Sequence, residues 1–256
     1  MKEGIDLNLK DLKILTLLIF TITMIYFYVL ALLQQSYLGF IMIIPILTLL
    51  IYYYATRKKI KLKQFFIKKP KIVPLLLSII FPIMLGLLVH LFLYSTNQGH
   101  FLFEKPFKLI FLFLIGITVS AGSALLEEIV WRGFYHDSLR KVYTLKKTAI
   151  IVAVIWSIWH LPIALFYKDY TQLFISTLSY LIILFFTSCL LTYLREWSGS
   201  VVPAAFFHGL MNVFYFSDGI HIHLSKHMTD LIKLLIFSLV LLMTLLLGKI
   251  HNLKER

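Results

Sequence analysis

Two adjacent glutamates followed by an arginine, Glu127, Glu128 and Arg132, end an apolar stretch that begins at Leu109. Charged side chains within or beside a membrane span are costly to bury, so they usually face protein partners or water and mark functional sites. Glu128 and Arg132 are four residues apart and can pair on one helix face, whereas Glu127 points about 100° away. A carboxylate paired with arginine is a poor proton acceptor, so the sequence favours Glu127 as a general base, with Glu128 and Arg132 supporting it. The alternative is a purely structural charge network at a helix end.

Three further polar side chains interrupt later apolar runs: His160, His208 and Asn212. Trp156 lies one helical turn before His160, and Asn212 lies one turn after His208. An imidazole and a carboxamide on one helix face can stabilise an oxyanion, or supply a metal ligand with an orienting partner. The structural alternatives are packing for His160 and hydrogen bonding between helices for the other two. Combined with a carboxylate base, these groups are the components for activating water and stabilising a tetrahedral intermediate in amide hydrolysis.

The order of these residues resembles the CPBP family of intramembrane proteases. Three motifs carry the resemblance, namely Glu-Glu-x-x-x-Arg at 127–132, Trp-x-x-x-His at 156–160 and His-x-x-x-Asn at 208–212. The family includes the eukaryotic CAAX prenyl endopeptidase and bacterial proteins, also called Abi proteins, that are linked to bacteriocin processing or self-immunity. Many members have Phe where this chain has Trp156, which is a conservative difference. The resemblance implies that Glu127 activates water with His160, while His208 and Asn212 hold the oxyanion.

The sequence leaves the cofactor open between none and a divalent metal such as zinc. Glu127, His160 and His208 could form a zinc site of two histidines and one glutamate, with an open position for water. The same residues could work as a glutamate protease that needs no metal. The resemblance to the CAAX endopeptidase supports the glutamate-dependent scheme at least as well, so we favour the metal-free interpretation.

Other intramembrane protease chemistries are disfavoured by the motifs. The chain has no His-Glu-x-x-His pair and no Gly-x-Gly-Asp motif, which disfavours zinc proteases of the site-2 type and aspartyl proteases. Ser123 lacks the context of a serine nucleophile. It belongs instead to a series of small residues spaced for helix packing: Gly116, Ser120, Ser123 and Ala124. We therefore predict that Ser123 has a packing role.

The composition indicates an all-α, polytopic membrane protein. The chain of 256 residues is 60% hydrophobic and only 14% charged, with a mean hydropathy of +0.87. One soluble core cannot hide so much apolar surface. The net charge of +13 is concentrated in short loops between apolar runs, so we expect contact with anionic membrane lipids and no binding of nucleic acid. The single cysteine, Cys189, lies in an apolar run, which excludes an intramolecular disulfide and disfavours a thiol nucleophile.

Apolar runs of spanning length, separated by charged or turn residues, predict about eight transmembrane helices. Their expected ranges are 14–33, 38–54, 72–94, 109–127, 148–166, 173–193, 201–216 and 230–247. No soluble domain is visible, so we expect a single transmembrane domain over residues 1–256. The resemblance to the protease family covers a core at about residues 72–220.

Lysine and arginine predict the orientation of these helices. The segment 57–71 is strongly basic and contains no acid, and the loop 140–147 and both termini are basic as well. Positive charge stays on the cytoplasmic side, so both termini should be cytoplasmic in what the family resemblance suggests is a bacterial cell membrane. Three histidines in the expected external loop, His221, His223 and His227, are interpreted as incidental.

The expected depths place the site in the cytoplasmic half of the membrane. Glu127 lies about 27 Å from the external start of its helix, and His160 lies about 18 Å from the cytoplasmic start of its own. His208 is about 10 Å from the start of the seventh helix. The first two depths match poorly, unless the fourth helix tilts or continues past Arg132 toward Leu139.

These inferences predict an intramembrane endopeptidase that cuts a membrane-associated peptide or protein. One alternative is a non-catalytic membrane scaffold or bacteriocin self-immunity protein of the same fold. Another is a proton-coupled transporter that uses Glu127 and the histidines as a relay. The absence of paired repeat halves in the sequence argues against transport. Nothing in the sequence indicates recognition of a prenyl group.

Overall fold

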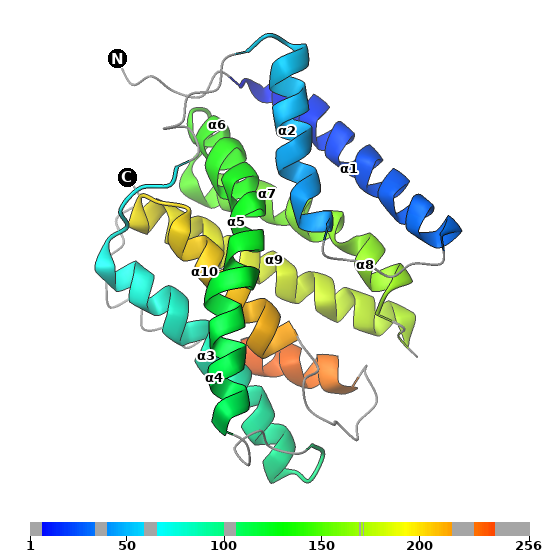
Figure 1. Ribbon diagram of the computed structural model, residues 1–256, viewed down its shortest axis with the longest axis vertical. Helices are drawn as coiled ribbons and strands as arrows, with labels where there is room; N and C mark the ends of the chain where they lie inside the picture. The colour runs from blue at the N-terminus through cyan, green and yellow to red at the C-terminus, as the bar shows by residue number, and fades with distance from the viewer. Residues whose placement is uncertain are drawn as a thin grey trace.

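The computed structural model describes residues 7–33, 40–58, 66–99, 106–168, 170, 172–216 and 228–238. Every element of regular structure within these ranges is a helix (Figure 1). The α-helices are α1 (Leu9–Leu32), α2 (Ile44–Ala55), α3 (Ile72–Ser95), α4 (Pro106–Ile115), α5 (Ala121–Glu128), α6 (His136–Arg140), α7 (Leu145–Trp159), α8 (Leu161–Phe166), α9 (Leu173–Ser198) and α10 (Val202–Met211). A short 3₁₀ turn, η1 (Ile41–Ile43), precedes α2. Residues 228–238 form a further helical segment.

Five helical stretches in the described residues are long and apolar enough to cross a membrane: Leu9–Leu32, Ile72–Ser95, Leu109–Arg140, Leu145–Phe166 and Leu173–Ser198. The stretches Ile41–Ala55 and Val202–Phe216 are apolar but shorter. The prediction of an all-α, polytopic membrane protein is therefore confirmed. Two of the expected spans, at 38–54 and 201–216, are shorter helices. The expected eighth span is described only as far as residue 238, and the external histidines and the basic C-terminus lie outside the described residues.

The fourth span is much longer than the predicted range of 109–127, because it runs without a break from Leu109 to Arg140 over 32 residues. Three stretches of π-helix occur in the described residues: η4 (Gly116–Ser120), η5 (Ile129–Tyr135) and η6 (Asn212–Phe216). The first two lie within this long helix, which passes through the middle of the molecule in Figure 1 and is coloured green. Short π segments in helices often occur near functional sites.

The extension of the fourth helix removes the mismatch in depth. At a rise of about 1.5 Å per residue, Glu127 lies about 20 Å from the end of the helix at Arg140. By the same rise, His160 lies about 22 Å from the start of α7 at Leu145. The turn between Arg140 and Leu145 is short, so both residues lie at similar distances from the same end of the bundle.

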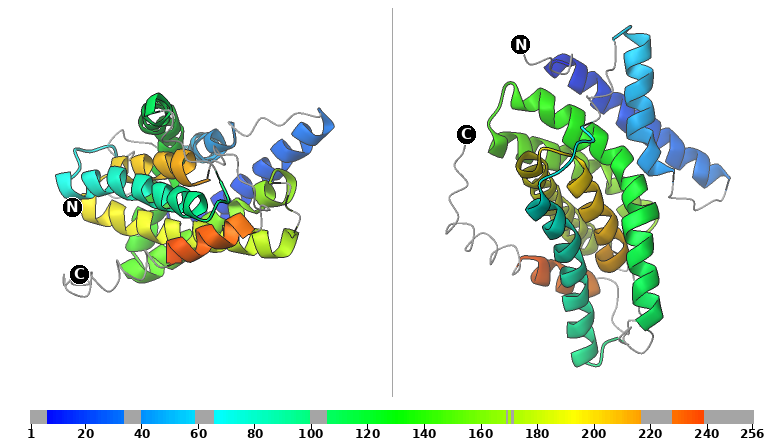
Figure 2. Two further views of the ribbon diagram at one scale, coloured as in Figure 1. Left: turned by 90° about the horizontal axis from the view of Figure 1, so that it is seen from below. Right: turned by 60° about the vertical axis from the view of Figure 1, so that its left-hand side comes forward.

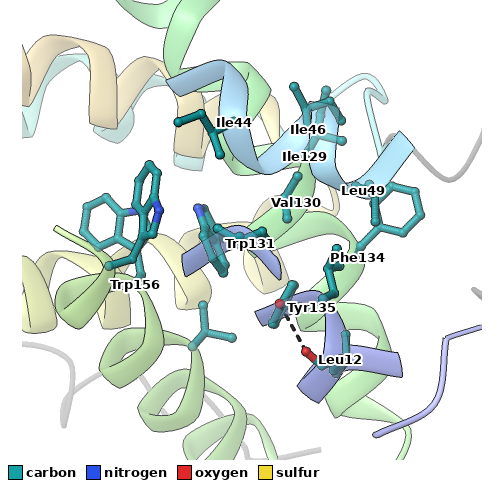
Figure 3. Close-up of a cluster of buried hydrophobic side chains, with 14 of the residues drawn as sticks. Leu12, Ile44, Ile46, Leu49, Ile129, Val130, Trp131, Phe134, Tyr135 and Trp156 are labelled. Atoms are coloured by element: carbon teal, nitrogen blue, oxygen red, sulfur yellow. Dashed lines mark hydrogen bonds between the residues drawn. The ribbon is translucent and has the colours of Figure 1, made fainter. Parts of the chain in front are cut away.

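A large apolar core joins α1 and α2 to the long helix. Buried side chains of α1, α2, η5 and α7 form it, and Figure 3 shows Leu12, Leu49, Phe134, Tyr135 and Trp156 among them. The Tyr135 hydroxyl lies 2.8 Å from the Thr16 hydroxyl and 3.3 Å from the Leu12 carbonyl oxygen. These contacts place α1 and α2 on one side of the long helix, while α3 lies on the other (Figures 1 and 2).

A second apolar core holds α3, α9 and α10 together with the segment 228–238. It includes Leu85, Val89, Phe207, Met211 and Phe237. Close backbone approach supports this packing, because a Cβ atom added to Gly86 would lie only 2.3 Å from the carbonyl oxygen of Phe214. A glycine therefore lets α3 touch the chain directly after α10.

A small-residue seam brings α10 against the long helix. A Cβ atom added to Gly209 would lie 2.4 Å from the backbone nitrogen of Ala121, and one added to Gly116 would lie 2.6 Å from Leu210. The Ser120 hydroxyl donates to the Gly209 carbonyl oxygen at 2.9 Å. Ser123 donates to the Ser120 carbonyl oxygen of its own helix at 2.9 Å, and its packing role stays a prediction. Small residues allow such close contact between membrane helices.

One end of the bundle gathers most of the charged side chains, and we call it the basic end. Lys58 after α2 forms an ion pair with Asp11 of α1 at 3.0 Å, and Arg140 of α6 pairs with Glu196 of α9 at 3.2 Å. Exposed lysines at the same helix ends include Lys10, Lys69, Lys141, Lys146 and Lys147. Since basic residues mark the cytoplasmic side, the cytoplasmic orientation of this end stays our prediction.

Candidate functional site

The polar residues singled out in the sequence converge inside the bundle. Glu127 and Glu128 come from α5, Arg132 from η5, and His208 from α10. His160 caps the end of α7, and Pro162 lies in the first turn of the short helix α8. All are buried: the exposed fraction is 0% for Glu127, Glu128 and Arg132, 2% for His208 and 6% for His160. Burial of this much charge is tolerable only where the groups are paired and hydrogen-bonded.

Glu128 is the member of the glutamate pair that lies beside Arg132 and His208. Its Oε1 accepts a hydrogen bond from Arg132 Nη1 at 3.1 Å and lies 2.9 Å from His208 Nδ1. The predicted pairing of Glu128 with Arg132 is therefore present in the structure. Arg132 also donates through Nη2 to the Ser188 hydroxyl at 2.7 Å, while its carbonyl oxygen accepts from Arg195 at 3.1 Å. Side chains from η5, α9 and α10 thus hold this carboxylate, either directly or through Arg132.

Glu127 has a different environment. Its Oε2 accepts a hydrogen bond from the indole Nε1 of Trp156 at 3.0 Å. Its Oε1 is buried and has no hydrogen-bond partner in the part of the chain that the structure describes. The sequence predicted a carboxylate without a cationic partner, and the neutral indole donor agrees with that. One oxygen of Glu127 is consequently left with its lone pairs unused.

The two histidines present different nitrogens to the site. His160 Nδ1 lies 2.9 Å from the carbonyl oxygen of Trp156, which can only accept, so Nδ1 carries a proton and Nε2 holds a lone pair in the neutral ring. His208 Nδ1 faces the Glu128 carboxylate and donates to it by the same reasoning. In the doubly protonated form, His208 Nε2 is also a donor.

Asn212 is the predicted site residue that the network does not include. It lies half-buried where α10 passes into η6. Its carboxamide makes no hydrogen bond to the other described site residues, although it is one turn beyond His208. Its proposed role at an oxyanion therefore stays a prediction.

The described residues contain no group of three or more His, Cys, Asp or Glu side chains placed to hold one metal ion. The choice between a metal-free site and a zinc site of Glu127, His160 and His208 therefore stays a prediction. One oxygen of Glu127 is already engaged by Trp156. Accordingly, no chemical step below passes through a metal.

Sequence reasoning missed the contribution of α9. Ser188 is completely buried and accepts from Arg132, and Thr192 lies one turn further on, also buried. Hydroxyl residues one turn apart on an apolar helix are a signal for an inward polar face. Trp159, whose ring centroid lies 4.8 Å from that of His160, was missed as well. Its indole donates to Thr23 of α1 at 2.8 Å, which connects α1 to the surroundings of the site.

The fold and site together define a polytopic membrane protein with a buried centre of two carboxylates, one arginine and two histidines. Residues 105–214 match the family described as "Type II CAAX prenyl endopeptidase Rce1-like". The chain is also 30% identical over 146 residues to "CAAX prenyl protease 2" of Methanococcus maripaludis, which covers 54% of this chain and 50% of that relative. The chain spans about half the length of this curated relative.

Both comparisons indicate the same family as the sequence motifs. The matched segment 105–214 contains the glutamate pair, both histidines and Asn212. The segment 105–214 is therefore similar to the CAAX protease family, and the resemblance predicted from the three motifs is confirmed.

Proposed function

We propose that this protein is an intramembrane endopeptidase, which hydrolyses a peptide bond in a membrane-associated peptide or protein with water activated by Glu127. The family match supports peptidase chemistry. The observation that carries the proposal is the division between the two glutamates. Glu128 is engaged by Arg132 and His208, whereas Glu127 keeps one buried oxygen without a partner among the described residues.

The first step is the activation of water. Glu127 Oε1 accepts one proton of a water molecule, and the lone pair of His160 Nε2 accepts a hydrogen bond from the second. These two acceptors orient the water oxygen toward the carbonyl carbon of the substrate. A new C–O bond forms as the electron pair of the carbonyl moves onto its oxygen, which becomes an oxyanion.

The second step is stabilisation and collapse of the tetrahedral intermediate. His208, doubly protonated and held at Nδ1 by the Glu128 carboxylate, donates from Nε2 to the oxyanion, and the Asn212 carboxamide supplies a second donor. Glu127 then returns its proton to the amide nitrogen. The C–N bond breaks, leaving a carboxylic acid and an amine. Arg132 acts through Glu128 by balancing its charge, and is a positioning residue.

Burial strengthens each of these interactions. A site shielded from bulk water has a lower effective dielectric constant, in which charge–charge and hydrogen-bond interactions are stronger. The less buried residues, Asn212 and His160, mark the edge at which a substrate carbonyl would reach the carboxylates. The distance of about 20 Å between Glu127 and the basic end places the proposed cleavage inside the membrane-spanning part of the bundle.

The test uses purified protein in liposomes with a panel of membrane peptides. Wild type is expected to cleave at least one peptide, and Glu127→Gln and His160→Ala should each lower the rate by about 10²–10⁴-fold, the usual contribution of a general base or its partner. Equal background cleavage in wild type and both variants would contradict the proposal. Such a result would leave a non-catalytic scaffold or a proton-coupled transporter of the same fold.

Metal dependence is tested on an active preparation. We expect full activity after chelation with phenanthroline, with metal removal verified by elemental analysis. Loss of activity that added zinc restores would instead assign Glu127, His160 and His208 to a metal site.

A further inference from the structure

Trp156 contacts side chains from three other elements of the site. The indole is hydrogen-bonded to Glu127, and its ring contacts Arg132 and His208. His160 packs against the same ring and lies within hydrogen-bond distance of the Trp156 backbone carbonyl oxygen. Trp156 itself is completely buried. An aromatic residue one turn before a histidine would need only a ring to pack, so these polar contacts require a separate explanation.

The first polar contact decides which oxygen of Glu127 is available. The indole Nε1 donates to Oε2 at 3.0 Å, and an indole nitrogen is a donor only. The second oxygen, Oε1, has no partner in the described residues. The hydrogen bond thereby makes the two oxygens of one carboxylate inequivalent.

The second contact orients His160. Its Nδ1 lies 2.9 Å from the backbone carbonyl oxygen of Trp156, and the two ring centroids are 4.5 Å apart. This contact fixes the tautomer of His160 and leaves Nε2 as the acceptor. One residue of α7 thus holds both groups that the proposed water would touch.

The indole ring of Trp156 also packs against the two partners of Glu128, Arg132 and His208. The Arg132 guanidinium lies 4.7 Å from the centroid of the indole ring, within the range of a cation–π contact. The His208 ring meets the indole edge to face, with centroids 5.3 Å apart and an interplanar angle of 89°. The guanidinium of Arg132 and the imidazole of His208 therefore both pack against the indole.

We propose that Trp156 is a positioning residue that commits Oε2 of Glu127 to the indole and so assigns proton transfer to Oε1, facing the water held by His160. The kinetic part of this inference rests on the proposed peptidase activity. The hydrogen bond itself does not, and it can be measured in an inactive protein.

The kinetic test compares Trp156→Phe with Trp131→Phe. Trp156→Phe keeps an aromatic ring but removes the donor, so kcat should fall by about 10- to 100-fold, as for loss of a hydrogen bond to a charged group, with KM changed by less than about twofold. The acidic limb of the pH–rate profile should move to higher pH, because a carboxylate without its donor holds a proton more tightly.

Trp131→Phe is the matched control. Trp131 is as deeply buried, and its indole nitrogen has no hydrogen-bond partner among the described residues. This substitution removes the same ring volume without removing a hydrogen bond, so kcat should stay within about twofold of wild type and the pH profile should not move. An equal loss in both variants, or an unchanged pH profile in Trp156→Phe, would overturn the inference.

The hydrogen bond is tested directly by the ¹⁵N-indole spectrum of the protein in detergent micelles. The chain has four tryptophans, and the Trp156 signal is identified by its absence in Trp156→Phe. That signal should shift in Glu127→Gln and stay in place in Glu196→Gln, which changes a carboxylate near the basic end. If the position of the Trp156 signal is unchanged in Glu127→Gln, the inference is overturned. A responsive signal in a protein that cleaves no peptide would support the hydrogen bond and contradict only the peptidase proposal.

Discussion

At the scale of single residues, the two adjacent glutamates differ because their partners come from different helices. Glu128 faces Arg132 and His208, and together these groups can balance its charge. Glu127, one residue earlier, faces an indole that carries no charge. A buried carboxylate without a cationic partner accepts a proton more readily than a paired one, as a general base must. The division of labour between the two residues follows from the direction in which each side chain leaves α5.

Arg132→Met tests the structural half of this division. The substitution keeps an unbranched side chain but leaves Glu128 as a buried charge with only His208 beside it. We expect a loss of about 3–5 kcal/mol in the free energy of unfolding, the usual cost of breaking a buried ion pair from one side. Thermal or denaturant unfolding in detergent micelles measures it.

Arg140→Met is the control for Arg132→Met. Arg140 pairs with Glu196 where both side chains are partly exposed, at 23% and 36%. This pair should contribute no more than about 1 kcal/mol to the free energy of unfolding. If the two variants are destabilised equally, Arg132 is not needed to neutralise Glu128.

The sequence predicted the pairs within one helix but not those between helices. Glu128 and Arg132 could be paired from their spacing of four, because the geometry of a single helix fixes it. Ser188 could not be assigned to Arg132, since periodicity tells which face a residue occupies and not which helix that face meets. For the same reason Trp156 was expected as a supporting ring, while its hydrogen bond to Glu127 appears only in the structure.

At the scale of the elements, the length of the fourth helix decides whether the site can assemble. The sequence placed its end at Glu127, because charged residues usually mark the membrane boundary. The helix instead continues to Arg140, since Arg132 and Glu128 offset each other and Ser188 of α9 accepts a further hydrogen bond from Arg132. Hydropathy assigns a cost to each charged residue separately and does not account for the residue that pairs with it. The π segments η4, η5 and η6 were also not predictable from the regular spacing of apolar residues.

Gly209→Ala tests the contact between α10 and α5 that brings His208 to Glu128. The added methyl group would lie 2.4 Å from the backbone nitrogen of Ala121, so α10 must move away from the long helix. We expect a loss of about 1–3 kcal/mol in stability from overpacking, measured by thermal unfolding. Cleavage should fall at least about tenfold, because a misplacement of about 1 Å in a catalytic group has large effects on rate.

Gly122→Ala is the matched control for Gly209→Ala. Gly122 lies exposed on the same long helix, and a Cβ atom there would meet nothing within 4 Å. The variant should keep wild-type activity and change stability by no more than about 1 kcal/mol, in the stabilising direction, because alanine favours a helix over glycine. Loss of cleavage in Gly122→Ala but not in Gly209→Ala would show that the seam does not position His208.

At the scale of the whole molecule, composition was enough to predict the class but not the arrangement. An apolar content of 60% with basic loops indicated a polytopic membrane protein. The packing of α1 and α2 on one side of the long helix and α3 on the other depends on which apolar faces fit together, as Figure 2 shows. Such faces are nearly equivalent in composition, and close contacts such as Gly86 on Phe214 decide between them.

The orientation of the whole bundle is tested by cysteine labelling in a Cys189→Ala background, which removes the single native thiol. Lys146→Cys introduces a thiol at the basic end and Ser95→Cys one at the opposite end of α3, and both native residues are exposed. Lysine and arginine stay on the cytoplasmic side of a membrane. A membrane-impermeant maleimide should therefore label Ser95→Cys in intact cells, and Lys146→Cys only after the cells are permeabilised. The reverse pattern would place the basic end on the external side. The basic end is the end of the long helix nearer to Glu127.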